Sequence, residues 1–200
     1  MKQYRLFFPS SILTLLSYIL CAILAFFHYP LPYSPWKNWL SDLGNKTLNP
    51  SGAIFYNSGI LLTASCLLLF FLGLSALKTG RNRIQDLMIN LTQIFGFFGC
   101  VSMASSSFFT IADPGPHSLL SAGLYICLGT AFAFSVAALR YDPKVPRWLL
   151  VLGAVAALFD LLASLFFNNV PVFEWVTVAL FLAYVLSVGV SLRSPTNKPV

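Results

Sequence analysis

The sequence predicts an all-α fold, a six-helix transmembrane bundle in which residues 1–200 form a single transmembrane domain. Six apolar stretches each approach the ~20 residues that a helix needs to cross a bilayer. The composition agrees, with 58% hydrophobic residues, 9% charged residues and a mean hydropathy of +0.79. A chain of 200 residues cannot cover that much apolar surface within a soluble core, so lipid must cover much of it.

The expected spanning helices cover residues 6–28, 54–77, 87–111, 119–139, 148–167 and 172–192. The first could be a secretory signal, but its apolar part exceeds the roughly 7 to 15 residues of such a signal and no small-residue cleavage site follows. The third is rich in Ser and Gly, which allow close helix packing, so we expect it to be the central helix. The four cysteines form no CxxC pair and are expected to pack between helices.

The Lys and Arg residues fall on alternate connections. One side carries only Lys37 and Lys46, whereas the other carries ten basic residues: Lys2, Arg5, Lys78, Arg81, Arg83, Arg140, Lys144, Arg147, Arg193 and Lys198. The positive-inside rule therefore predicts that both termini are cytoplasmic. Because these residues lie in short connections beside the membrane, we expect them to contact the lipid bilayer and expect no nucleic-acid partner, despite a net charge of +6.

Residues 29–53 form the longest connection, YPLPYSPWKNWLSDLGNKTLNPSGA. Its prolines exclude a continuous helix, and Trp36 and Trp39 are suited to the interface between membrane and water. This segment is expected to be an extracytoplasmic cap loop over the bundle.

Four acids map to the outer half of the molecule together with both histidines, His28 and His117. Asp160 is the deepest, roughly 10 Å below the outer end of its helix at 1.5 Å per residue. A carboxylate there costs about 2.5 to 3.5 kcal/mol unless it finds a partner or a wet cavity. Two interpretations stay open: a neutral acid that hydrogen-bonds Ser105 on the third helix, or a group that binds a ligand or a proton. The candidate ligand or proton site comprises Asp42, Asn57, Asp113, His117, Ser121, Asp160 and Glu174.

The segment from Asp113 to Ser118 reads DPGPHS. Pro116 is expected to open the fourth helix, with His117 in its first turn and Ser121 one turn later. An Asp, a His and a Ser are compatible with a hydrolase, but the chain has neither a nucleophile elbow nor a zincin motif, and two histidines are few for a zinc enzyme. We therefore assign no catalytic residue and no metal site, and the cofactor stays unassigned.

Several short motifs resemble a known family. They are Ser41-Asp42-Leu43-Gly44, Asn49-Pro50, Asn57, Asp113 and His117-Ser118, and their pattern is similar to that of the domain-of-unknown-function family 998, small polytopic membrane proteins of bacteria and archaea. The resemblance implies six helices, a polar outer cluster and the inner (plasma) membrane of a prokaryote, and it implies no reaction. The Ser, Asp and His residues also resemble, more loosely, those of alkaline-ceramidase-like membrane hydrolases, but this chain lacks their seven helices and their additional histidines.

We therefore expect an integral membrane protein with an outward-facing polar pocket that binds or moves a small ligand, a lipid headgroup or an ion. The alternative is a membrane-embedded hydrolase or transferase that acts on lipid at the outer leaflet, with His117 and one or two of the acids as general acid and base. A third possibility is a structural subunit whose polar residues only hold helices together.

Overall fold

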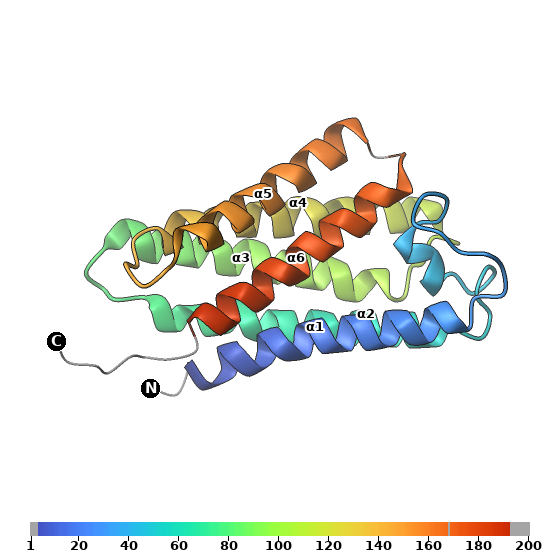
Figure 1. Cartoon of the computed structure of the whole chain (residues 1–200), viewed down its shortest axis with the longest axis horizontal. Helices are drawn as coiled ribbons and strands as arrows, with labels where there is room; N and C mark the ends of the chain where they lie inside the picture. The colour runs from blue at the N-terminus through green and yellow to red at the C-terminus, as the bar shows by residue number, and fades with distance from the viewer. Residues whose placement is uncertain (1–3, 168, 193–200) are drawn as a thin grey trace.

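The computed structural model describes residues 4–167 and 169–192, with only the backbone course for residues 4–6. It contains six α-helices: α1 (Tyr4–Phe27), α2 (Ala53–Gly73), α3 (Arg83–Ser106), α4 (Pro114–Leu139), α5 (Arg147–Phe166) and α6 (Pro171–Ser191). Two short 3-10 helices, η1 (Leu40–Gly44) and η2 (Leu74–Leu77), complete the fold, and the described residues contain no strand. All six α-helices are long and apolar enough to cross a membrane, so the all-helical transmembrane prediction is confirmed (Figure 1).

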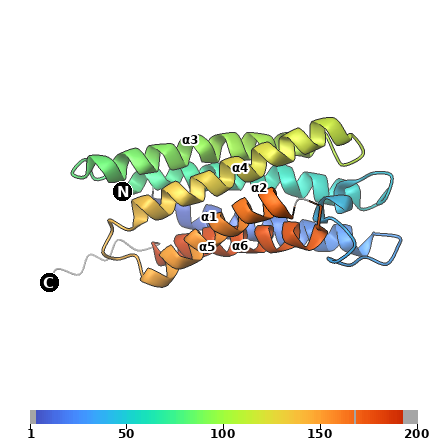
Figure 2. The ribbon, with the colours of Figure 1, turned by 90° about the horizontal axis from the view of Figure 1, so that it is seen from above.

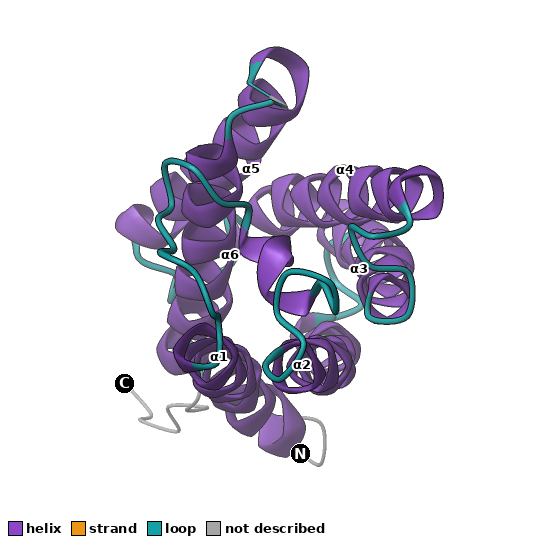
Figure 3. Cartoon of the chain, turned by 90° about the vertical axis from the view of Figure 1, so that its right-hand side faces the viewer, coloured by secondary structure: helices purple, strands orange, loops and turns teal. Residues whose placement is uncertain are grey.

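The helices form a closed ring in which each contacts its neighbours in chain order and α6 returns to α1 (Figures 2 and 3). The prediction that the third helix is central is wrong. α3 packs between α2 and α4 on the perimeter and exposes a large apolar face that includes Phe97 and Phe98. Its glycines still bring neighbours close, because Gly96 lies against Phe71 of α2 and Gly99 against Leu128 of α4.

Helix α4 begins at Pro114 rather than at Pro116 or Leu119. Proline disrupts a helix interior because it lacks an N–H donor and because its ring clashes with the carbonyl four residues earlier, and neither effect applies in the first turn. Both prolines therefore fit inside that turn, and the backbone carbonyl of Asp113 accepts the N–H of His117 at 3.0 Å. Helix α3 likewise begins early, at Arg83, because the side chain of Asn82 caps it by accepting the N–H groups of Ile84 and Gln85.

The connections divide between the two ends of the bundle. One end carries residues 28–52, called here the cap segment, together with the α3–α4 and α5–α6 connections (Figure 1). The opposite end carries the basic connections 78–82 and 140–146 and both ends of the described chain. Lys2, Arg193 and Lys198 lie outside the described residues. The charge asymmetry thus follows the two ends of the bundle, and the cytoplasmic location of the basic end stays a prediction.

Candidate functional site

The cap segment is fastened to the bundle by one fully buried amide. Asn49 is 0% exposed, and its Nδ2 donates to the carbonyls of Ala25 and Leu43, each at 3.0 Å. Its Oδ1 accepts the N–H of Gly52 at 3.1 Å. Gly52 is required there because a Cβ would collide with the Asn49 amide and with the carbonyl of Ala25. One side chain therefore joins the end of α1, η1 and the start of α2.

The helix η1 lies over the same end of the ring and is tied to α6. The backbone N–H of Leu40 donates to Oε2 of Glu174 at 2.7 Å, and Nε1 of Trp175 donates to the carbonyl of Asn38 at 3.1 Å. The hydroxyl of Tyr33 donates to the carbonyl of Trp39 at 2.7 Å. Burial raises the pKa of the Tyr33 phenol, so it remains a neutral donor. These bonds fix the position of Ser41, which faces the interior.

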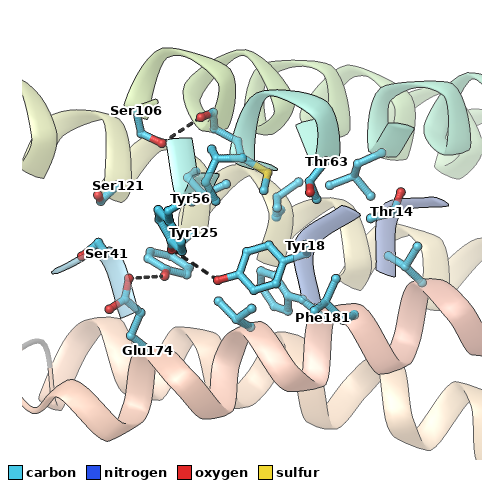
Figure 4. Close-up of a pocket in the computed structure, with 18 of the residues that line it drawn as sticks. Thr14, Tyr18, Ser41, Tyr56, Thr63, Ser106, Ser121, Tyr125, Glu174 and Phe181 are labelled. Carbon is cyan, nitrogen blue, oxygen red and sulfur yellow. Dashed lines mark hydrogen bonds between the residues drawn. The ribbon is translucent and has the colours of Figure 1, made fainter. Parts of the chain in front are cut away.

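A cavity of about 80 Å³ runs from beneath η1 toward the middle of the bundle. One buried water needs about 10 to 15 Å³ on the same measure, so there is room for several waters or a small ligand. Figure 4 shows Glu174, Ser41 and Ser121 at one end and Thr14 and Thr63 toward the other. The lining comes from α1, η1, α2, α3, α4 and α6: Thr14, Tyr18, Ser41, Tyr56, Ile60, Thr63, Leu67, Met103, Ser106, His117, Ser121, Leu124, Tyr125, Leu128, Phe132, Glu174, Val178, Phe181, Leu182 and Val185.

His117 and Ser121 form an ordered polar pair on the α4 side of the cavity. Nδ1 of His117 lies 3.0 Å from the carbonyl of Phe109, and because a carbonyl only accepts, this nitrogen carries the proton. In the neutral ring Nε2 is then the acceptor, and the hydroxyl of Ser121 lies 3.4 Å from it. The carbonyl thus orients the imidazole so that its basic nitrogen faces a hydroxyl in the cavity.

On the α6 side, Glu174 is surrounded by tyrosines. The hydroxyl of Tyr125 donates to Oε1 at 3.4 Å (Figure 4). The hydroxyls of Tyr18 and Tyr56 lie 3.3 Å apart, and their rings meet edge to face with centroids 6.3 Å apart and an angle of 71° between planes. Among the residues that line the cavity, Glu174 is the one carboxylate and His117 the one side chain able to carry a positive charge.

Phe132 closes the inner end of the cavity. Its ring centroid lies 4.6 Å from that of Phe181 and 5.0 Å from that of Tyr184, whose hydroxyl is 2.6 Å from Ser135 Oγ. Phe132 also lines a second, apolar cavity of about 10 Å³ toward the basic end of the bundle. Phe132 therefore lies between the two cavities and lines both of them.

The structure brings only some of the predicted site residues together. His117, Ser121 and Glu174 line the cavity. Asp42 and Asn57 instead form hydrogen bonds with the backbone of the cap segment. Oδ2 of Asp42 accepts the N–H of Trp39 at 3.0 Å, and Nδ2 of Asn57 donates to the carbonyl of Gly44 at 2.9 Å. Burial raises the pKa of Asp42, an effect that the hydrogen bond from Trp39 partly opposes.

Two predicted residues lie elsewhere. Asp113 is exposed on the surface at the start of α4. Asp160 is 4% exposed, but it lies in the interface of α5 with α4, where its Oδ2 occupies the space left by the missing side chain of Gly129. Of the two interpretations left open for Asp160, the hydrogen bond to Ser105 of α3 is therefore wrong, because α5 packs against α4 and α6. Within the described part of the chain, no three His, Cys, Asp or Glu side chains gather in a way that could hold a metal ion.

Comparison with known proteins agrees with the motifs around η1 and α4. The family model described as protein of unknown function (DUF998) matches residues 12–191, nearly the whole chain. The chain belongs to this family. No curated protein and no solved structure matches it. This DUF998 member is thus an integral protein of a lipid bilayer.

The aromatic walls of the cavity were not expected from the sequence. Tyr18, Tyr56 and Tyr125 each sit in an apolar helix, where a tyrosine is read as a packing residue. A signal was present, because each phenol places a hydroxyl in the outer half of a spanning helix, where a partner is needed. The sequence does not show that these three helices direct their phenols toward one point, because this depends on how the six helices pack.

Proposed function

We propose that this protein binds a small amphipathic ligand that enters from the cap end. The observation that carries the proposal is the shape of the cavity, which has polar side chains beneath η1 and an apolar interior extending to Phe132. Ligand sites of this kind are concave, mostly apolar and furnished with a few polar groups that fix orientation. A polar head would contact Glu174, His117 and Ser121, and an apolar portion would lie between α1, α2, α4 and α6.

Photoaffinity labelling tests this proposal. Protein in nanodiscs is irradiated with dodecanol that carries an alkyl diazirine, and labelled peptides are identified by mass spectrometry. We expect label on cavity residues such as Met103, and expect Val178→Trp, which fills the cavity, to remove most of it. The matched control is Val176→Trp, because Val176 is 38% exposed and absent from the lining. Label confined to outward-facing residues and unchanged by Val178→Trp refutes ligand binding in the cavity.

A second candidate function is acyl transfer or ester hydrolysis on a lipid, favoured by the contact between Ser121 and His117. Ser121 Oγ would attack the ester carbonyl while His117 Nε2 takes its proton, the alcohol would leave with that proton, and water would release the acyl group. The arrangement is incomplete in one respect, because two of the first three residues of α4 are prolines and leave few N–H groups for an oxyanion.

A fluorophosphonate probe separates this candidate from simple binding. Covalent labelling that Ser121→Ala abolishes and Ser118→Ala leaves intact supports acyl transfer, because Ser118 is an exposed serine one residue from His117. Equal labelling of both variants, or none in the wild type, leaves ligand binding as the proposal.

A further inference from the structure

We infer that the head group of the ligand is an organic ammonium ion, held by Glu174 and the aromatic rings of Tyr18 and Tyr56. This inference rests on the proposed function, because it names the chemical class of the molecule that the cavity binds. Two features of the cavity support it: the charge of the lining and the arrangement of the aromatic rings.

The charge of the cavity is unbalanced. Glu174 is the carboxylate of the lining, and no Lys or Arg side chain contributes to it. Transfer of an unpaired carboxylate away from water is costly unless a cation or several donors compensate. The donors to Glu174 are all neutral groups: the N–H of Leu40, at 2.7 Å from Oε2, the N–H of Ser41, and the hydroxyl of Tyr125, at 3.4 Å from Oε1. A cation in the cavity would supply the opposite charge that these donors lack.

The aromatic walls suit the same kind of ion. Rings that meet at 71°, as those of Tyr18 and Tyr56 do, form two sides of a box rather than a flat stack. Ammonium groups are attracted to such ring faces within about 6 Å of the centroid, and quaternary ammonium ligands are bound by aromatic cages of this kind. Phe132 and Phe181 extend the aromatic surface inward, where they would contact the apolar part of the ligand.

Competing ligand classes fit less well. A lipid phosphate or a fatty-acid carboxylate would face Glu174 with like charge and without a Lys or Arg to bind it. A divalent metal ion needs several hard oxygen or nitrogen ligands, and the described residues hold no cluster of three His, Cys, Asp or Glu side chains. A neutral alcohol would use the hydroxyl groups and leave Glu174 without a cation.

Competition against the dodecanol diazirine label tests the inference at pH 8. Three probes with the same chain are compared: hexyltrimethylammonium, hexanol and hexanoate. We expect the ammonium probe to compete at concentrations at least about tenfold lower than hexanol, with hexanoate weakest. Glu174→Gln should raise the competing concentration of the ammonium probe by about tenfold or more, which removes the preference, while changing the competing concentration of hexanol by less than about threefold. Asp113→Asn is the control, because it removes an exposed acid from the same end of the bundle.

A second pair of variants covers the case in which Glu174→Gln does not fold. Tyr18→Phe keeps the ring and should keep the preference for the ammonium probe, whereas Tyr18→Leu removes the ring and should weaken it. The outcomes also separate the two proposals. Labelling by the diazirine with equal competition by ammonium and alcohol refutes the ammonium inference and preserves the cavity as a ligand site, whereas absence of cavity labelling refutes the proposed function itself.

Discussion

Replacement of Asn49 by Ala removes three hydrogen bonds at a position with no access to solvent. The lost bonds are those to the carbonyls of Ala25 and Leu43 and from the N–H of Gly52. A buried hydrogen bond contributes about 0.5 to 1.5 kcal/mol, and a backbone group left without a partner costs about 1 to 3 kcal/mol. With a net loss of about 1 kcal/mol for each of the three bonds, the free energy of unfolding should fall by about 3 kcal/mol.

Denaturation in mixed micelles, followed by tryptophan fluorescence, measures this difference. Asn49→Asp is the sharper variant, because it keeps the size of the side chain but replaces two donated hydrogen bonds by repulsion from two carbonyls, and it should destabilise at least as much. Asn38→Ala is the control, since that side chain is only partly buried, so water can replace its bonds to Ser34 N–H, at 3.1 Å, and to Tyr29 and Asp42, and the change should cost less than Asn49→Ala. Asn49→Ala within about 0.5 kcal/mol of the wild type would show that the cap segment is held by other contacts.

Three further predictions concern orientation and the acids outside the cavity. A cysteine introduced at Thr47, an exposed residue of the cap segment, should be labelled by an impermeant reagent from outside, and one at Asn82 should not, because ten basic residues against two predict that the cap end is outside; the opposite pattern overturns the orientation. Asp160→Asn should leave labelling of the cavity unchanged, since Asp160 lies against Gly129 and not in the lining, and a loss of labelling would contradict this. Burial raises the pKa of Asp42, so the folded protein binds the proton of this carboxyl more tightly than the unfolded chain does, and stability should fall as the pH rises through the folded pKa. Asp42→Asn should flatten this dependence. Wild-type and Asp42→Asn proteins whose stability changes equally between pH 4 and 8 would refute the prediction.

Hydropathy and charge were sufficient to predict the spans and the two ends of the bundle, because depth in the membrane follows directly from position along a helix. The direction in which each side chain points does not follow from position along the helix, because it depends on how the helices pack. Asp160 and Glu174 were both expected in one outer site. In the structure, Asp160 lies on the face of α5 that packs against α4, whereas Glu174 lies on the face of α6 that borders the cavity. His117 and Ser121 were correctly placed one turn apart, since the four-residue spacing fixes their common face without knowledge of the packing.

The two acids of the spanning helices show that a costly carboxylate does not by itself identify a site. Asp160 lies well inside α5, where a carboxylate costs about 2.5 to 3.5 kcal/mol, whereas Glu174 lies in the first turn of α6. Asp160 is buried in the interface of α5 with α4, where its carboxylate occupies the space beside Gly129 and does not line the cavity. Glu174 instead borders a space large enough for a ligand, and it is joined through Leu40 to the helix that covers that space. A ligand that binds Glu174 would therefore share this carboxylate with the N–H of Leu40 in η1.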